Sequence, residues 1–249
     1  MRYNANIKDV IRLSFMRLDK LLSDMGIASR KELKAIIKAG RAAVNGKAVC
    51  VPETKLDPER DVVSLDGVTL KYAKAHYYMM DKPCGVLTAT EDRKQKTVLD
   101  LLSPEAKKLE LFPVGRLDKD TSGLLLLTDD GDFAHRVISP KSNIQKLYHA
   151  VVEGIPDEKD VKAFADGIVL ADGTECLPAK LEITGKNDCF VTVMEGKYHQ
   201  VRRMLASRGK PVKELRRLRI GALEIDTTLG SGGFRELEQE EIDGIFLST

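Results

Sequence analysis

Apolar residues in the first quarter of the chain recur at helical spacing and then give way to short hairpin-like segments. In residues 18–24 the leucines recur at intervals of three and four, which predicts an amphipathic helix. Ser29 can cap a second helix, and Glu32 completes a capping box with it. The Asn-Gly pair at 45–46 separates two short apolar segments and predicts a tight hairpin. Residues 16–67 are therefore expected to form a small unit of two helices followed by hairpins.

From residue 76 onward the pattern predicts strands that alternate with short helices. The expected strands are residues 77–80, 124–127, 146–153, 179–184 and 190–194, and the expected helices are 133–138, 159–165 and 238–246. Residues 215–221 alternate imperfectly and carry several arginines, which predicts a basic strand at a sheet edge. The predicted fold class is α+β: a small N-terminal domain and a larger domain whose mostly antiparallel mixed sheet is flanked by helices.

These patterns divide the chain into four expected parts. Residues 1–15 carry no clear period and are an extension of unknown role, and residues 16–67 are the first domain. Pro58 and the Asp-Gly pair at 66–67 are expected to close that domain, with residues 68–75 as a linker. Residues 76–249 form the second domain.

Charge is distributed unevenly although the net charge is only +2. Residues 16–50 hold eight Lys or Arg against three acids, and residues 197–219 hold nine against Glu214 alone. Residues 224–243 reverse the balance, with seven acids against Arg235. Solvated faces can produce such runs, but two basic segments offset by an acidic one favour contact with a polyanion.

The composition argues against several classes of protein. The four cysteines are far apart and include no C-x-x-C pair, so we expect buried thiols, not zinc or a disulfide framework. With four histidines we also expect no metal centre. No apolar run approaches the ~20 residues that span a bilayer, and the first 15 residues do not resemble a signal peptide. We therefore expect a cytoplasmic protein that acts without a membrane and as a monomer.

Asp118 is the first candidate for chemistry. It lies on a polar loop between Pro113 and Gly123, directly before the leucine run at 124–127. An acid on a loop that leads into a buried strand is anchored by the core and still open to a cleft, as a catalytic carboxylate must be. Asp, Thr, Ser and Gly are also common in ordinary turns, so the loop alone does not establish a site.

A second candidate site lies at the start of a predicted helix. Val201, Met204 and Leu205 share one helical face, which places Arg202 and Arg203 beside it near the N-terminal end. That end of a helix attracts anions, and arginines there favour a phosphate or carboxylate site. A surface pair of arginines without a partner is the alternative.

The first domain resembles the S4 RNA-binding domain. The resemblance runs through MRLDKLLSDMGIASRKELKAIIKAGRAAVNGKAV and includes R-L-D-K at 17–20, the Ser-Arg pair at 29–30 and G-R-x-x-V-N-G at 40–46. It implies RNA binding by a set of basic side chains. These are Arg17, Lys20, Arg30, Lys31, Lys34, Lys38 and Arg41. Arg203 in the second domain is a further residue that we expect to bind RNA.

The second domain resembles the pseudouridine synthases, in the branch that carries an S4 domain and modifies ribosomal RNA. The motifs are K-P-x-G at 82–85, G-R-L-D-x-D-T-x-G-L-L-L-L-T-x-D-G at 115–131, E-G-K-Y-H-Q-V-R-R-M at 195–204 and L-x-R-x-x-I-G-x-L at 215–223. Within the branch the chain is most similar to enzymes of 16S ribosomal RNA, of the type that modifies uridine 516. The resemblance therefore implies ribosomal RNA, within a partly assembled small subunit, as the partner.

The resemblance also implies residue roles. Asp118 matches the carboxylate that acts as nucleophile or charge partner on the ribosyl side of the target uridine, and Arg202 matches the basic residue that pairs with it. Tyr148 matches the tyrosine that stacks on the base and is linked to proton removal from C5. Arg116 matches the arginine that fills the space left by the extruded uridine. Asp120 is expected to be structural, and no cofactor is expected because the isomerisation needs no redox change, metal or nucleotide.

Three alternatives remain open at this stage. A large-subunit 23S ribosomal RNA could be the target. The chain could instead be a non-catalytic RNA-binding or ribosome-assembly factor. Asp118 and Asp120 could be the acid pair of a glycoside hydrolase, but two acids separated by one residue on a loop are poorly placed to flank a bond from opposite sides.

Overall fold

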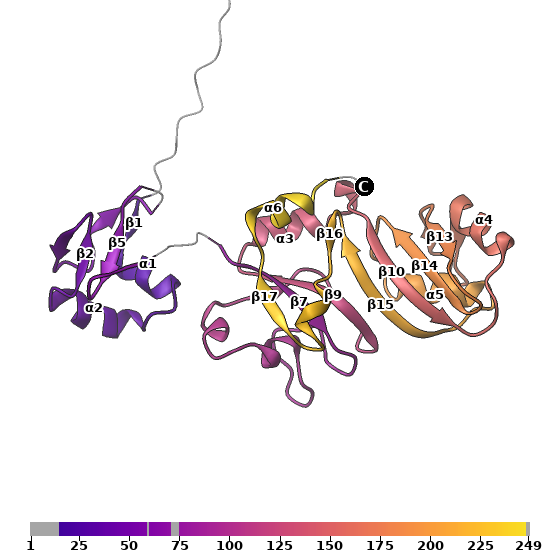
Figure 1. The fold of residues 1–249 in the computed structure, drawn as a ribbon, viewed down its shortest axis with the longest axis horizontal. Coiled ribbons are helices and arrows are strands. Elements are labelled where there is room, and N and C mark those ends of the chain that lie inside the picture. Colours follow the sequence, from indigo (N-terminus) through magenta and orange to yellow (C-terminus); the bar gives the residue numbers. More distant parts are fainter. Residues whose placement is uncertain (1–14, 59, 71–74, 248–249) are drawn as a thin grey trace, which may run out of the picture. The chain divides into compact units, whose positions relative to one another are not determined.

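The computed structural model describes residues 15–58, 60–70 and 75–247, and the chain divides into two compact units, residues 1–74 and 75–249 (Figure 1). Each unit has its own hydrophobic core. The expected extension at 1–15 lies outside the described residues except for Phe15, which is exposed. Among the described residues no helix is long and apolar enough to cross a membrane.

The first unit contains two helices and a small sheet. The helices are α1 (Leu18–Asp24) and α2 (Arg30–Lys38). The four-stranded sheet has the order β3 (Lys47–Val49), β2 (Ala42–Val44), β5 (Val63–Leu65), β6 (Val68–Leu70), and β1 (Met16–Arg17) pairs with β4 (Lys55–Leu56). The predicted capping box is confirmed, since Ser29 Oγ accepts from the Glu32 amide and the Glu32 carboxylate accepts from the Ser29 amide. Local sequence therefore determines where α2 begins.

Two Asx-Gly turns build the sheet of this unit. Asn45 and Gly46 both have positive φ, 51° and 76°, and join β2 to β3 as the dipeptide predicts. Asp66 and Gly67 have φ of 51° and 81° and join β5 to β6 in the same way. The predicted linker at 68–75 is therefore wrong over Val68–Leu70, because a turn of this kind continues into a paired strand. Residues 71–74 of that linker lie outside the described residues.

The described residues of the second unit build a nine-stranded sheet. Its main order is β13 (Lys180–Ile183), β14 (Asp188–Val193), β10 (Lys146–Val152), β15 (Val212–Ile220), β9 (Thr121–Thr128), β7 (Tyr77–Lys82), β17 (Phe234–Glu236). β16 (Leu223–Glu224) pairs with β15, and β8 (Phe112–Pro113) pairs with β9. The β9–β15 pair is parallel and the other pairs are antiparallel. The predicted α+β class with a mostly antiparallel mixed sheet is confirmed.

Helices and short helical turns connect these strands. They are α3 (Gly131–Ile138), α4 (Glu158–Asp166), α5 (Gln200–Ser207) and α6 (Gln239–Gly244), with 3₁₀ turns η1 (Val98–Leu101), η2 (Ala106–Lys108), η3 (Pro140–Ser142) and η4 (Thr227–Leu229). A separate ribbon pairs β11 (Ile168–Val169) with β12 (Glu175–Cys176). The expected buried thiols are correct for Cys176 and Cys189 and wrong for Cys50 and Cys84, which are exposed.

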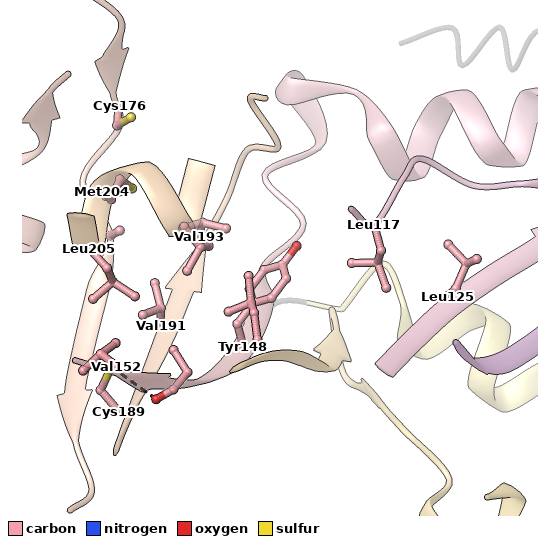
Figure 2. Packing of buried hydrophobic residues seen from close by; sticks show 14 of the residues in the cluster. Leu117, Leu125, Tyr148, Val152, Cys176, Cys189, Val191, Val193, Met204 and Leu205 are labelled. Carbon is pink, nitrogen blue, oxygen red and sulfur yellow. Dashed lines mark hydrogen bonds between the residues drawn. The ribbon is translucent and has the colours of Figure 1, made fainter. Parts of the chain in front are cut away.

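Strand β9 is buried on both faces, which explains its continuous leucine run. Leu125 and Leu127 belong to one hydrophobic cluster, together with Tyr148 and residues of α5 (Figure 2). Leu124 and Leu126 belong to a second cluster with residues of α3. A strand covered on both faces needs apolar side chains at consecutive positions. Asp118 therefore lies three residues before one of the best anchored strands of the unit.

Strand β15 is central, so the prediction of an edge strand is wrong. It lies between β10 and β9, and two of its arginines have partners inside the unit. Arg216 forms a two-pronged ion pair with the buried Asp81, at 2.8 and 2.9 Å. Arg217 is buried and donates to the Leu124 carbonyl at 2.8 Å. These two contacts connect β15 to β7 and β9 inside the unit.

Candidate active site

The loop that carries Asp118 is held by hydrogen bonds that its main-chain carbonyl groups accept. Thr88 Oγ1 donates to the Leu117 carbonyl at 2.7 Å, and the Thr121 amide donates to the Asp118 carbonyl at 3.0 Å. The Gly85 amide donates to the Lys119 carbonyl at 2.7 Å. Hydrogen bonds from Gly85, Thr88 and Thr121 therefore fix the loop and leave the Asp118 carboxylate to the pocket.

Lys82 also binds the main-chain carbonyl groups of this loop. Its side chain is fully buried at the end of β7, and Nζ donates to the carbonyls of Pro83, Asp118, Lys119 and Thr121 at 2.8–3.4 Å. Burial lowers the pKa of the Lys82 ammonium. Four carbonyl oxygens surround the ammonium group and replace the water molecules that it would bind in solution. The ammonium group in turn satisfies loop carbonyls that water does not reach.

Arg202 holds the loop from the side of α5. Its Nη2 donates to the Asp120 carbonyl at 3.0 Å and lies 3.1 Å from the Asp120 carboxylate. Nη1 donates to the Val212 carbonyl at the start of β15, at 3.4 Å. The expected ion pair between Arg202 and Asp118 is therefore absent from the described contacts, because the guanidinium is already engaged two residues further along the loop. The Asp120 carboxylate is thus the acid that contacts Arg202.

Asp118 shares a small pocket with two of the other predicted site residues. Arg116, Asp118 and Tyr148 line it, as do Thr121 from β9 and residues 195–197 and 199–201 from the turn before α5 and the start of that helix. The pocket has a volume of about 70 Å³, room for roughly two water molecules. Arg116 is exposed and makes no ion pair or hydrogen bond with any residue that the structure describes. The structure thus brings together three predicted side chains from a loop and a strand.

Tyr148 reaches the pocket from the buried face of β10. Its side chain is 9% exposed and lies between Val193 and Leu117 (Figure 2). The hydroxyl is 3.4 Å from Arg217 Nη1, and the guanidinium carbon is 6.0 Å from the centre of the ring. Arg217 Nη2 is buried without a partner in the described structure. A cation beside the ring and hydroxyl favours negative charge at this end of the pocket.

The imidazole of His199 lies close to the Asp118 carboxylate. Its Nε2 is 3.3 Å from Asp118 Oδ1. His199 precedes α5 and adopts left-handed backbone angles, φ 48° and ψ 34°. That conformation costs of order 1–3 kcal/mol for a residue with a side chain. The strain is consistent with a functional position, because it aims the imidazole at the pocket.

Glu195 fixes the turn that presents His199. It is 7% exposed, and its Oε1 accepts from the Leu177 amide at 2.9 Å and from Gln200 Nε2 at 2.8 Å. Its Oε2 lies 2.6 Å from Lys197 Nζ. Gln200 Oε1 in turn accepts from the Lys197 amide. A buried carboxylate with this many partners orients the segment, so Glu195 serves the pocket through its neighbours.

A second basic feature lies in the first unit. Arg17, Lys20, Arg30, Lys31 and Lys34 line one concave surface together with Asp19, with a volume of about 500 Å³. We call these residues the α1–α2 groove. Lys38 and Arg41 are outside it, and Arg41 pairs with Asp66 at 2.6 Å. Of the predicted RNA-binding residues, five therefore converge on one surface.

Arg203 does not line the pocket of Asp118. Its Nη2 lies 2.6 Å from the Asp172 carboxylate in the loop between β11 and β12.

Among the described residues, no three His, Cys, Asp or Glu side chains cluster as they would around a metal ion.

Sequence reasoning missed Lys82, His199 and Glu195 as parts of the site. Lys82 could have been found as a lone cation at the end of the apolar run 77–80, directly before Pro83. His199 and Glu195 lie inside a motif that was recognised, but nothing in residue spacing shows which of its side chains faces Asp118.

A mixed sheet with a carboxylate, a tyrosine and an arginine around one pocket, preceded by a small basic α/β unit, defines an RNA-modifying enzyme with a separate RNA-binding domain. Residues 76–207 match the family of RNA pseudouridylate synthases, and residues 16–62 match the S4 domain. The chain belongs to the pseudouridine synthase family and is an RNA pseudouridine synthase with an N-terminal S4 domain. Both resemblances to these families are confirmed.

Similar proteins extend over nearly the whole chain. An uncharacterized RNA pseudouridine synthase of Bacillus subtilis, YtzG, is 44% identical over 91% of this chain and 97% of its own. The ribosomal small subunit pseudouridine synthase A of Vibrio parahaemolyticus is 42% identical over 93% and 100%, and that of Escherichia coli K12 is 38% identical over 92% and 100%. A crystal structure of a pseudouridylate synthase superposes with a TM-score of 0.65 at 33% identity, covering 92% of this chain and 99% of that one.

Proposed function

We propose that this enzyme converts one uridine of 16S ribosomal RNA to pseudouridine and that Asp118 is its catalytic carboxylate. The observation that carries the proposal is the shared pocket of Asp118, Arg116 and Tyr148. The choice of 16S RNA draws support from the relatives named for the ribosomal small subunit, with which the chain shares about 40% of its residues along their full length.

The reaction breaks the bond between N1 of uracil and C1′ of ribose, and joins C1′ to C5. A proton leaves C5 and a proton is gained at N1, so no atom is lost or added and no oxidant is needed. In the proposal the Asp118 carboxylate acts on the ribosyl side, at C1′. Its loop is held by Lys82 and Arg202 through main-chain oxygens, which keeps the carboxylate in place while the base turns over.

Tyr148 and Arg116 would serve the base and the space that it leaves. The Tyr148 ring lines the pocket and can stack on the extruded uracil. Arg217 Nη1 lies 3.4 Å from its hydroxyl, the group that would take the proton from C5 in the proposal. Arg116 is exposed at the same pocket and without a described partner, so it is available to enter the vacated stack.

Extruding a base costs a few kcal/mol, and RNA contacts must supply that energy. The α1–α2 groove provides a basic concave surface for the phosphate backbone. We expect the reaction to take place in the cytoplasm. We also expect its substrate to be a partly assembled small subunit and the enzyme to act as a monomer.

The test compares ribosomal RNA from a strain with and without the protein by mapping carbodiimide adducts of pseudouridine. We expect one pseudouridine to be missing from 16S RNA, and we expect purified protein to restore it. A missing pseudouridine in 23S RNA would instead identify a large-subunit enzyme. If neither RNA lost a pseudouridine and the purified protein modified neither, the proposal would be wrong.

Asp118→Asn tests the catalytic residue in the same assay. We expect it to abolish formation of pseudouridine while its affinity for the RNA, measured by filter binding, stays within a few-fold of wild type. Lys119→Met is the matched control, because Lys119 is the neighbour of Asp118 on the same loop and its side chain is exposed. It should retain most of the activity. Equal loss in both variants would show a loop effect and contradict a specific role for Asp118.

A further inference from the structure

Tyr198 presents an exposed aromatic ring next to the pocket. Its side chain is 69% exposed, although tyrosine usually buries much of its ring. One face of the ring is stacked on His199, with ring centres 3.8 Å apart and planes inclined by 18°. The two rings form a nearly parallel pair, which we call the Tyr198–His199 platform. Most of its apolar area contributes nothing to the core of the unit.

The Tyr198–His199 platform contacts the loop of Asp118 through His199. His199 lines the pocket and lies 3.3 Å from the Asp118 carboxylate, whereas Tyr198 is not among the residues that line it. Tyr198 is therefore at the rim, one ring further from Asp118 than His199. The Tyr198 carbonyl accepts from Arg203 Nη1 at 3.4 Å, and Arg203 is fixed by Asp172, so the backbone that carries the ring is braced.

The chemistry of the platform suits a nucleic-acid base. Unpaired bases stack on exposed aromatic side chains whatever their sequence, because every base has a π-face. If Asp118 acts at the ribose of the target uridine, the nucleotide next to that uridine must pass the rim of the pocket. A ring that is already ordered by stacking loses little freedom when a base stacks on its other face.

We propose that the Tyr198–His199 platform is a binding subsite for the base of a nucleotide adjoining the target uridine. The inference rests on the proposed role of Asp118 at the target ribose. It adds a second nucleotide to the site: Tyr148 stacks on the extruded uracil inside the pocket, and Tyr198 stacks on its neighbour outside.

The experiment is a thermodynamic cycle between protein and RNA. The RNA is a synthetic fragment that carries the uridine identified by the mapping above, made in three forms: intact, abasic at the 5′ neighbour and abasic at the 3′ neighbour. We expect Tyr198→Ala to lower kcat/KM about tenfold on the intact RNA. On one of the abasic RNAs the same substitution should have an effect of less than about twofold, because the stacking partner is already gone.

Two further variants control the measurement. Tyr198→Phe keeps the ring and should recover most of the loss on intact RNA. Val169→Ala removes an equally exposed apolar side chain, 67% exposed on β11, and should leave the activity unchanged on all three RNAs. Thermal unfolding of Tyr198→Ala should match that of the wild type.

The inference is overturned if Tyr198→Ala has no effect on the intact RNA, or if it lowers kcat/KM equally on all three. Because the fragment is chosen from the uridine that the wild-type enzyme modifies, an error in the proposed target is discovered before the cycle begins. An active Asp118→Asn would overturn the proposed catalytic residue and leave the outcome of the cycle readable.

Discussion

Lys82 Nζ donates a hydrogen bond to the main-chain carbonyl of Asp118 at 3.1 Å, from a side chain that is completely buried. The same ammonium group reaches the carbonyls of Lys119 and Thr121. The candidate catalytic carboxylate is thus positioned by a cation that contacts its backbone and leaves its side chain to the pocket.

Lys82→Met should disrupt both stability and catalysis. The variant keeps the volume of the side chain but leaves several buried carbonyls without a donor, at a cost of about 1–3 kcal/mol for each group that water cannot reach. We expect the free energy of unfolding in urea to fall by about 3 kcal/mol or more, and kcat to fall further than KM rises. Lys119→Met on the same loop, whose side chain is exposed, is the control. Similar losses in both variants would contradict the prediction.

Gly123→Ala should prevent normal pairing of β9 with β15. Gly123 has φ of +102°, and a Cβ there would lie 2.2 Å from the Arg217 carbonyl oxygen and 2.7 Å from its nitrogen. Backbone atoms on a central strand cannot move aside, so we expect a loss of about 4 kcal/mol or more, or no folded protein. Gly46→Ala is the matched control, with φ of +76° and nothing within 4 Å of the added Cβ.

The control variant should lose only about 1 kcal/mol, the cost of the left-handed conformation alone. Denaturant titrations of the two variants give the comparison directly. A Gly123→Ala protein as stable as Gly46→Ala would mean that β15 does not approach β9 as closely as described.

Lys146 should make stability depend on pH above neutrality. Burial, and then repulsion by Arg217, lowers the pKa of the Lys146 ammonium from 10.5 to about 8. Between these values the unfolded chain binds more protons than the folded one, so stability rises with pH. The contribution is complete above about pH 10.5 and is lost as the pH falls through about 8.

Lys146→Met removes the buried ammonium and should flatten this dependence. At pH 7 we expect the variant to be more stable by up to about 3 kcal/mol. Urea titrations at intervals from pH 7 to pH 10 measure the slope. Lys180→Met, on β13 with a side chain 68% exposed, should keep the wild-type slope. An unchanged slope in Lys146→Met would show that another group titrates.

The α1–α2 groove should contribute most of the salt-dependent affinity of the first unit. Removing Lys31 and Lys34, which line it, should reduce the slope of log affinity against log salt by about 0.7–0.9 for each RNA phosphate that is no longer neutralised. Lys47→Ala changes an exposed lysine on β3, outside the groove, and should leave the slope unchanged. If all three lysines reduce the slope equally, the unit binds RNA through diffuse charge.

Features specified by neighbouring residues were predictable. Ser29 and Glu32 locate the start of α2, and the Asn-Gly turn at 45–46 joins β2 to β3. The leucines at 124–127 predicted a buried strand, and the loop before it holds Asp118 as expected. In each case the deciding interaction spans a few residues, so composition and spacing contain it.

Contacts between distant residues were not predictable in the same way. The arginines of β15 suggested an edge strand, but Arg216 pairs with Asp81, 135 residues away in sequence. Arg202 was expected beside Asp118 and instead contacts Asp120. Both errors have one cause: the charge of an arginine is visible in the sequence, whereas the acid that it meets depends on which strands are neighbours.

The sequence by itself determined the family, the two domains and the identity of the candidate carboxylate, because these depend on motifs and on local periodicity. Only the tertiary structure decided how that carboxylate is held. The parallel pairing of β15 with β9, with Arg217 opposite Gly123, brings the start of β15 and α5 to the Asp118 loop. The burial of Lys82 beneath the same loop and the approach of His199 to Asp118 join segments 36 or more residues apart. Such positions follow from the packing of the whole sheet, which no short stretch of the chain encodes.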